Sequence, residues 1–140
     1  MRISKRLSAN DIGATGGHQA GIHVPKQAEI LSFLPTLPRS QKNPRLTLTV
    51  REMESGELWE FQYIYYNNRH FDVGGTRNEY RLTGMTSFLR SVAAGVGDEL
   101  EFTKDEDGSL HMRLIRKAQT DGEENIDVLV LRSGWIIINR

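Results

Sequence analysis

The sequence predicts a mainly β fold, a barrel or sandwich of about seven or eight short strands with two short helices. Three observations lead to this prediction. Polar and apolar residues alternate over short runs, turn signals such as Asp107-Gly108 separate these runs, and helical periodicity is confined to two brief segments. With 140 residues, the chain has the size of one domain, residues 1–140, and can bury a core without disulfides.

Two short strands begin the chain, separated by a glycine-rich loop. We expect them at Arg2 to Leu7 and Gly21 to Val24, with a loop over 8–19. No Lys follows the last glycine of this loop, so it is not a phosphate-binding loop. It is either an arm that could lie along a DNA backbone or an ordinary surface loop. Pro25 suits the first turn of a helix over 26–33, because its missing N–H costs nothing there.

A long hairpin forms the centre of the predicted sheet. Residues 45–53 alternate between apolar and polar side chains, and residues 58–66 return after the turn at Glu54-Ser55-Gly56-Glu57. The returning strand carries four aromatic residues on one face, Trp59, Phe61, Tyr63 and Tyr65. Such a face indicates core packing between strands.

The last third of the chain contains one more helix and four strands. The helix is expected over 86–94, where Gly95 and Gly97 then stop it. The strands are expected at 98–103, 109–116, 127–131 and 135–138.

Arg77, Glu79 and Arg81 alternate along the segment that leaves the central hairpin. If this segment is extended, the three side chains share a face, with Asn78 and Tyr80 behind them. Arg donates two hydrogen bonds to guanine and Glu accepts from cytosine, so this face could read a G·C pair. A surface salt-bridge ladder that reads nothing is the alternative.

Composition and motifs exclude several kinds of site. The absence of cysteine rules out disulfides, thiolate zinc sites and cysteine catalysis. The sequence has no Asp/Glu-x-Lys pattern of metal-dependent nucleases, no His-x₃-His pair and no Gly-x-Ser-x-Gly elbow. We therefore expect no catalytic residue, metal or cofactor in this chain. A phosphodiesterase-like site at Arg69-His70 with Asp72 is the alternative.

The net charge is zero, but the charges are unevenly distributed. Residues 1–90 hold 12 Lys and Arg against 8 Asp and Glu, whereas residues 91–140 hold 6 against 10. A neutral total can therefore contain a basic face suited to phosphate. No apolar run is long enough to span a membrane and the first residues lack the apolar core of a signal peptide, so we expect a cytoplasmic protein.

Two segments together resemble the N-terminal DNA-binding domain of EcoRII-type restriction endonucleases. The first is KRLSANDIGATGGHQ at residues 5–19, and the second is YYNNRHF at 65–71 followed by TRNEYRLT at 76–83. The resemblance implies an open DNA-binding pseudobarrel of about seven or eight strands, akin to those of plant auxin-response transcription factors. It also implies a prokaryotic domain without a nuclease site that reads a CCWGG-type sequence (W is A or T) in the major groove.

The resemblance further assigns residues to two arms that grip the groove. The N-arm corresponds to residues 5–18 and the C-arm to residues 69–81. The base readers are then Arg77, Glu79 and Arg81. The other residues expected at the DNA are Lys5, Arg6, Ser8, Asn10, Asp11, Thr15, His18, Gln19, Arg69, Asn78 and Tyr80.

The C-arm departs from the family pattern in two ways. Its loop over 72–75 is longer than usual, and Gly75 and Tyr80 stand where lysines are usual. Two lost cations predict fewer phosphate contacts and a shallower dependence of binding on salt. Arg69, Arg90 or Lys42 could compensate for them.

We therefore expect the DNA-binding N-terminal part of a larger restriction endonuclease, monomeric as an isolated domain. Its partners would be duplex DNA and a C-terminal nuclease domain, and Mg²⁺ would be needed only in that separate domain. A standalone repressor-like DNA-binding protein and a small nuclease are the alternatives.

Overall fold

The computed structural model describes residues 1–13, 21–117, 127–130 and 134–139, and its strands within these ranges join a single sheet. The strands are β1 (Arg2–Arg6), β2 (Ile22–Val24), β3 (Arg45–Glu52), β4 (Leu58–Tyr66), β5 (Glu79–Thr83), β6 (Glu99–Lys104), β7 (Leu110–Ile115), β8 (Asp127–Val130) and β9 (Trp135–Asn139). The helices are α1 (Ala28–Phe33), α2 (Thr86–Ser91) and the 3-10 turn η1 (Asn68–His70). The prediction of a mainly β fold with two short helices is confirmed, with nine strands in the described residues instead of seven or eight.

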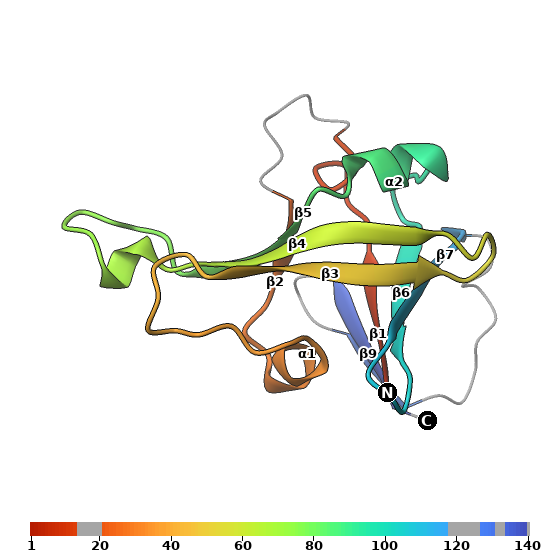
Figure 1. The fold of residues 1–140 in the computed structure, drawn as a ribbon. Helices are drawn as coiled ribbons and strands as arrows, with labels where there is room; N and C mark the ends of the chain where they lie inside the picture. Colours follow the sequence, from red (N-terminus) through yellow and green to blue (C-terminus); the bar gives the residue numbers. More distant parts are fainter. Residues whose placement is uncertain (14–20, 118–126, 131–133, 140) are drawn as a thin grey trace.

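The sheet is strongly curled, as in an open barrel (Figure 1). Its strand order is β2-β5-β4-β3-β7-β6-β1-β9-β8, and each pair is antiparallel except β3 and β7. Although β2 and β9 lie near opposite ends of this order, Trp135 Nε1 of β9 donates to the carbonyl oxygen of His23 in β2 over 2.8 Å. The two ends of the sheet therefore approach each other across the interior.

The interior of the curled sheet is filled by large apolar side chains. Trp135, Phe61 and Tyr63 are fully buried, and both helices add residues to the same core, including Ile30 from α1 and Phe88 from α2. The predicted aromatic face of residues 58–66 packs inward, as the alternation indicated. Burial of this kind stabilises a fold by about 25 cal/mol per Å² of apolar surface.

Both helices are shorter than predicted, each for a local reason. The first helix begins at Ala28 because Gln27 is still extended, with φ −65° and ψ 130°. The second helix ends at Ser91, before Ala93, whose φ of 50° is left-handed. In the charged segment 77–81, β5 begins only at Glu79, because the amide of Arg77 donates to a side chain, Oδ1 of Asn68, instead of a neighbouring strand.

The connection between β4 and β5, which is the predicted C-arm, projects away from the body of the sheet (Figure 1, left). It carries η1 and leads directly into the charged residues Arg77, Glu79 and Arg81, the last two of which lie on β5. The fold therefore presents this charged strand at the base of a protruding arm.

Candidate nucleic-acid interface

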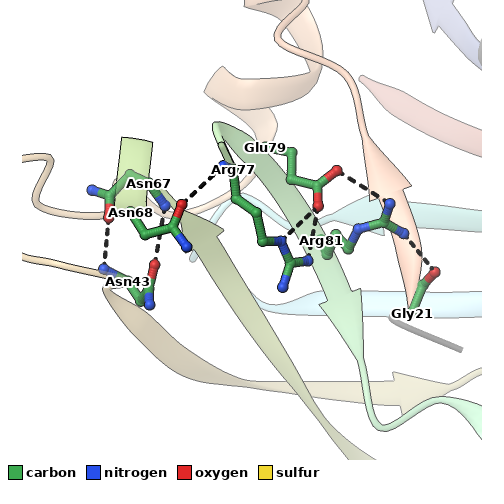
Figure 2. A network of polar contacts seen from close by, with 7 residues as sticks. All are labelled: Gly21, Asn43, Asn67, Asn68, Arg77, Glu79 and Arg81. Carbon is green, nitrogen blue, oxygen red and sulfur yellow. Dashed lines mark hydrogen bonds and ion pairs between the residues drawn. The ribbon is translucent and has the colours of Figure 1, made fainter. Parts of the chain in front are cut away.

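Arg77, Glu79 and Arg81 form one ion-pair network, which we call the Arg-Glu-Arg ladder (Figure 2). Arg77 donates from Nε and Nη2 to Glu79 Oε1 over 3.0 and 2.8 Å, and Arg81 donates from Nη2 to Glu79 Oε2 over 3.1 Å. The side chains of Arg77, Glu79 and Arg81 are 37%, 25% and 20% exposed. The alternation in the sequence therefore placed the three side chains on one face correctly.

The ladder retains hydrogen-bonding capacity for a ligand. Burial alone would raise the pKa of Glu79, but hydrogen bonds from Arg81 and Arg77 outweigh it and hold the pKa below its ordinary value. The carboxylate is therefore ionised at neutral pH. Each of its oxygens can accept two hydrogen bonds, so Oε2, with one donor among the described residues, keeps one acceptor position. Donors and an acceptor of this kind are those that recognise a G·C pair.

Arg81 connects the ladder to the exit of the N-arm. Its Nη1 donates to the carbonyl oxygen of Gly21 over 3.2 Å, immediately before β2. Gly21 has a φ of 82°, and a side chain there would overlap the carbonyl of Leu82. Glycine thus allows the close approach of β2 and β5 that places this carbonyl beside Arg81.

Tyr80 and Asn78 lie behind the ladder, on the core side of the same segment. The ring of Tyr80 stacks on that of Tyr65 at 4.2 Å and is only 5% exposed, and the Tyr65 hydroxyl donates to Asn78 Oδ1 over 2.6 Å. The side chain at position 80 therefore supports the strand from within the core. The expectation that Tyr80 replaces a phosphate-contacting cation does not fit this placement, because the position faces away from the surface.

Asparagine side chains brace the base of the C-arm (Figure 2). Asn67 is 1% exposed and forms two hydrogen bonds with Asn43. The backbone amide of Asn43 donates to Asn67 Oδ1 over 2.7 Å, and the backbone amide of Asn67 donates to Asn43 Oδ1 over 3.1 Å. Asn68 Oδ1 accepts from the amide of Arg77 over 2.8 Å. These bonds hold the base of the C-arm at the end of β4 and fix the position of the Arg77 backbone.

The longer loop over 72–75 folds back on the arm. Lys42 pairs with Asp72 at 2.6 Å, and the amide of Gly75 donates to the carbonyl of Asp72 over 3.0 Å. A side chain at Gly75 would overlap the carbonyl of Asn68, so the lysine that the resemblance led us to expect there could not occupy this conformation. Arg69 remains exposed on the arm, where phosphate could reach it.

The described part of the N-arm is a compact turn. Lys5 Nζ lies 3.2 Å from Asp11 Oδ2, and both side chains are less than a tenth exposed. Asp11 Oδ2 also accepts from the amide of Ser8, whose hydroxyl accepts from the amide of Asp11. Arg6 pairs with Glu99 at 3.3 Å, and Asn10 is exposed. The predicted contacts of Thr15, His18 and Gln19 lie outside the described residues.

Two residues beside the ladder were missed by the sequence reasoning. His23 is the register partner of Arg81, and Tyr66 is the register partner of Glu79. Burial and then the charge of Arg81 lower the pKa of His23, so its imidazole is mainly neutral at pH 7. Strand register was the signal that would have placed both residues here, and it could not be read from sequence alone.

In the described ranges, no group of three or more His, Asp and Glu side chains is arranged to hold a metal ion. None of the helices there is both long and apolar enough to cross a membrane.

Comparisons with known proteins relate the whole domain to restriction enzymes. The family model described as "Restriction endonuclease EcoRII, N-terminal" matches residues 1–134. The type II restriction enzyme EcoRII of Escherichia coli is 37% identical over 134 residues, covering 90% of this chain and 32% of that protein. Auxin response factor 15 of Oryza sativa subsp. japonica is 31% identical over 115 residues, covering 82% and 14%. The chain thus spans about a third of the length of EcoRII and about a seventh of that of the plant factor.

Two solved structures share the fold. The UbaLAI restriction endonuclease B3 domain with cognate DNA has a TM-score of 0.59 and 21% identity, covering 98% of this chain and 84% of that one. The Arabidopsis FUS3–DNA complex has a TM-score of 0.58 and 15% identity, covering 81% and 94%. The predicted DNA-binding-type pseudobarrel is therefore confirmed as the fold.

Proposed function

The chain belongs to the family of N-terminal domains of restriction endonuclease EcoRII, and on this premise we propose that it binds duplex DNA at a specific sequence. The site is of the CCWGG type, and a C/G half-site is read from the major groove. The two arms hold the duplex, and the domain acts as the specificity or effector domain of a type II restriction endonuclease.

The single observation that carries this proposal is the geometry of the Arg-Glu-Arg ladder at the base of the C-arm. Both guanidinium groups are oriented by one ionised carboxylate, which keeps an acceptor position that no described residue fills. Arg can bond guanine O6 and N7, while Glu can accept from the cytosine amino group. Two donor groups around one acceptor match adjacent G·C pairs, which a CCWGG half-site supplies.

In this proposal, the remaining arm residues contribute mainly to position and affinity. Arg69 is exposed on the C-arm and Arg6 is half-exposed at the root of the N-arm, so both are available to phosphates. Lys5 and Asp11 act through their mutual ion pair, which holds the turn of the N-arm. Thr15, His18 and Gln19 of the N-arm would add further contacts to the DNA.

We further propose that the domain itself cuts no DNA and needs no cofactor to bind it. A C-terminal nuclease domain would carry the Mg²⁺-dependent chemistry, with this domain as its sequence-reading partner. The domain would bind DNA as a monomer, since the ladder and both arms come from one chain.

A binding measurement with matched duplexes tests the proposal. Fluorescence anisotropy would compare a CCWGG duplex with a GGWCC duplex of the same composition at about 0.15 M salt. We expect binding to the first duplex to be tighter by about a thousandfold or more, with or without EDTA. Equal affinities would contradict sequence-specific binding, and Mg²⁺-dependent cleavage by the chain alone would contradict its non-catalytic role.

A further inference from the structure

We propose that Tyr66 is a positioning residue for Arg77, because its ring holds the guanidinium plane in the orientation that base recognition requires. The inference rests on the proposed function, since it concerns how the ladder meets DNA. It assigns a role to an aromatic residue that does not belong to the core face of its own strand.

Tyr66 points to the opposite side of β4 from the other aromatic residues. Phe61, Tyr63 and Tyr65 enter the core, whereas Tyr66, one position further, turns to the outer face and remains partly exposed. There it is the register partner of Glu79, the centre of the ladder. The strand pairing therefore places one tyrosine ring under the charged network.

The ring makes direct contact with Arg77. The Cζ atom of Arg77 lies 3.6 Å from the centre of the Tyr66 ring, which is the geometry of a cation–π contact. The edge of the same guanidinium bonds Glu79 through Nε and Nη2. One face and one edge of the group are thus occupied, while Nη1 has no hydrogen-bond partner among the described residues.

Arg77 depends on these side-chain contacts more than Arg81 does. Arg81 stands within β5 and has a second restraint at the carbonyl of Gly21. Arg77 precedes the strand, and its backbone is held by Asn68 and Arg69 of the arm. An arginine side chain has many rotamers, so the ring lowers the entropy lost when Nη1 and Nη2 bind a guanine.

The chemistry of the contact predicts which substitutions preserve it. The π face acts on the cation, and the tyrosine hydroxyl takes no part in this contact. Tyr66→Phe should therefore keep the arrangement, and Tyr66→Leu should lose it while leaving an apolar side chain of moderate size. Leu58→Ala, a truncation at an exposed position of the same strand and outside both arms, provides the control.

The experiment combines binding with a direct observation of Arg77. We expect Tyr66→Leu to weaken binding of the CCWGG duplex about three- to tenfold, with little effect on the GGWCC duplex. Tyr66→Phe and Leu58→Ala should bind like the unmodified chain. In NMR spectra without DNA, the Arg77 Nε–H signal should show the ring-current shift in the unmodified chain and in Tyr66→Phe, and lose it in Tyr66→Leu. Thermal melting checks the fold, and Tyr66→Thr replaces Tyr66→Leu if the latter does not melt cooperatively.

A double variant separates positioning from general support of the fold. If Tyr66 acts through Arg77, adding Tyr66→Leu to Arg77→Ala should weaken binding no further. Additive losses, or an unshifted Arg77 Nε–H signal in the unmodified chain, would overturn the inference while leaving sequence-specific binding intact. An unmodified chain that binds both duplexes equally would overturn the proposed function and this inference together.

Discussion

The protein contains two Arg-Glu-Arg networks that are alike in composition and different in construction. On β5, Glu79 pairs with Arg77 and Arg81, two residues away on either side. On the opposite part of the sheet, Glu101 of β6 pairs with Arg2 of β1 at 3.0 Å and Arg113 of β7 at 3.1 Å. The first network lies along a single segment, whereas the second joins the β6–β7 hairpin to β1, which is distant in sequence.

The two networks also differ in how far their central carboxylate is exposed to solvent. The carboxylate side chain of Glu101 is 4% exposed, whereas that of Glu79 is 25% exposed. A ligand can approach Glu79 and exchange hydrogen bonds with it, while Glu101 is enclosed by its partners. Two arginines around a glutamate therefore form an enclosed network in one place and an accessible polar surface in the other, and topology and exposure decide which.

Removing the enclosed carboxylate should have the largest effect on stability. Glu101→Gln leaves Arg2 and Arg113 without their charged partner, and we expect the free energy of unfolding to fall by about 3 kcal/mol. Glu79→Gln should cost about 1 kcal/mol or less, because its pairs are local and better hydrated. Urea unfolding of both variants measures the difference, and equal losses would refute the division into a supporting and a presenting network.

Removing an arginine should have its larger effect on DNA binding in the exposed network. We expect Arg81→Ala to weaken binding of a CCWGG duplex by about 1–3 kcal/mol and to relax discrimination at one guanine. Arg113→Ala removes the same charge from the supporting network and provides the control. Titrations against duplexes with single guanine substitutions measure the effect, and a similar uniform loss in both variants would indicate only non-specific attraction.

The smallest effect expected is a pH dependence of stability that arises from Glu79. Its pKa is lower in the folded chain than the ordinary value of 4.5, so its contribution is present above about pH 4.5 and is lost as the pH falls through the folded pKa. Above pH 4.5, the unmodified chain should be more stable than Glu79→Gln by about 1 kcal/mol or less. This difference in the free energy of unfolding should become smaller as the pH falls below 4.5. Urea unfolding at several pH values measures this, with Glu57→Gln as the control, and a difference that grows as the pH falls would contradict the assignment.

Much of the fold and the outline of the site were predictable from local patterns. The alternation along residues 58–66 correctly separated core aromatics from the outer face, and the alternation at residues 77–81 grouped the ladder. Both inferences succeed because side chains two apart in a strand share a face, whatever the strand pairs with.

The remainder depends on pairings between distant segments. The burial of Tyr80 follows from its stacking on Tyr65, and the role inferred for Tyr66 follows from its register with Glu79. The Lys5–Asp11 pair likewise depends on how the N-arm turns back on β1. Register and turn geometry are set by the packing of the whole sheet, so one-dimensional patterns could not supply them.

The place of β1 in the sheet has a consequence for how the chain acquires its structure over time. This strand, at residues 2–6, lies between β6 and β9. It pairs with residues 99–103 of β6 and with residues 135–138 of β9. It therefore has to wait for partners made much later in synthesis, with both of its edges unpaired until then. Pairings of such long sequence separation are typical of domains that fold in milliseconds to seconds, more slowly than helical bundles. The central hairpin of β3 and β4, whose strands are adjacent in sequence, is the natural place for folding to begin.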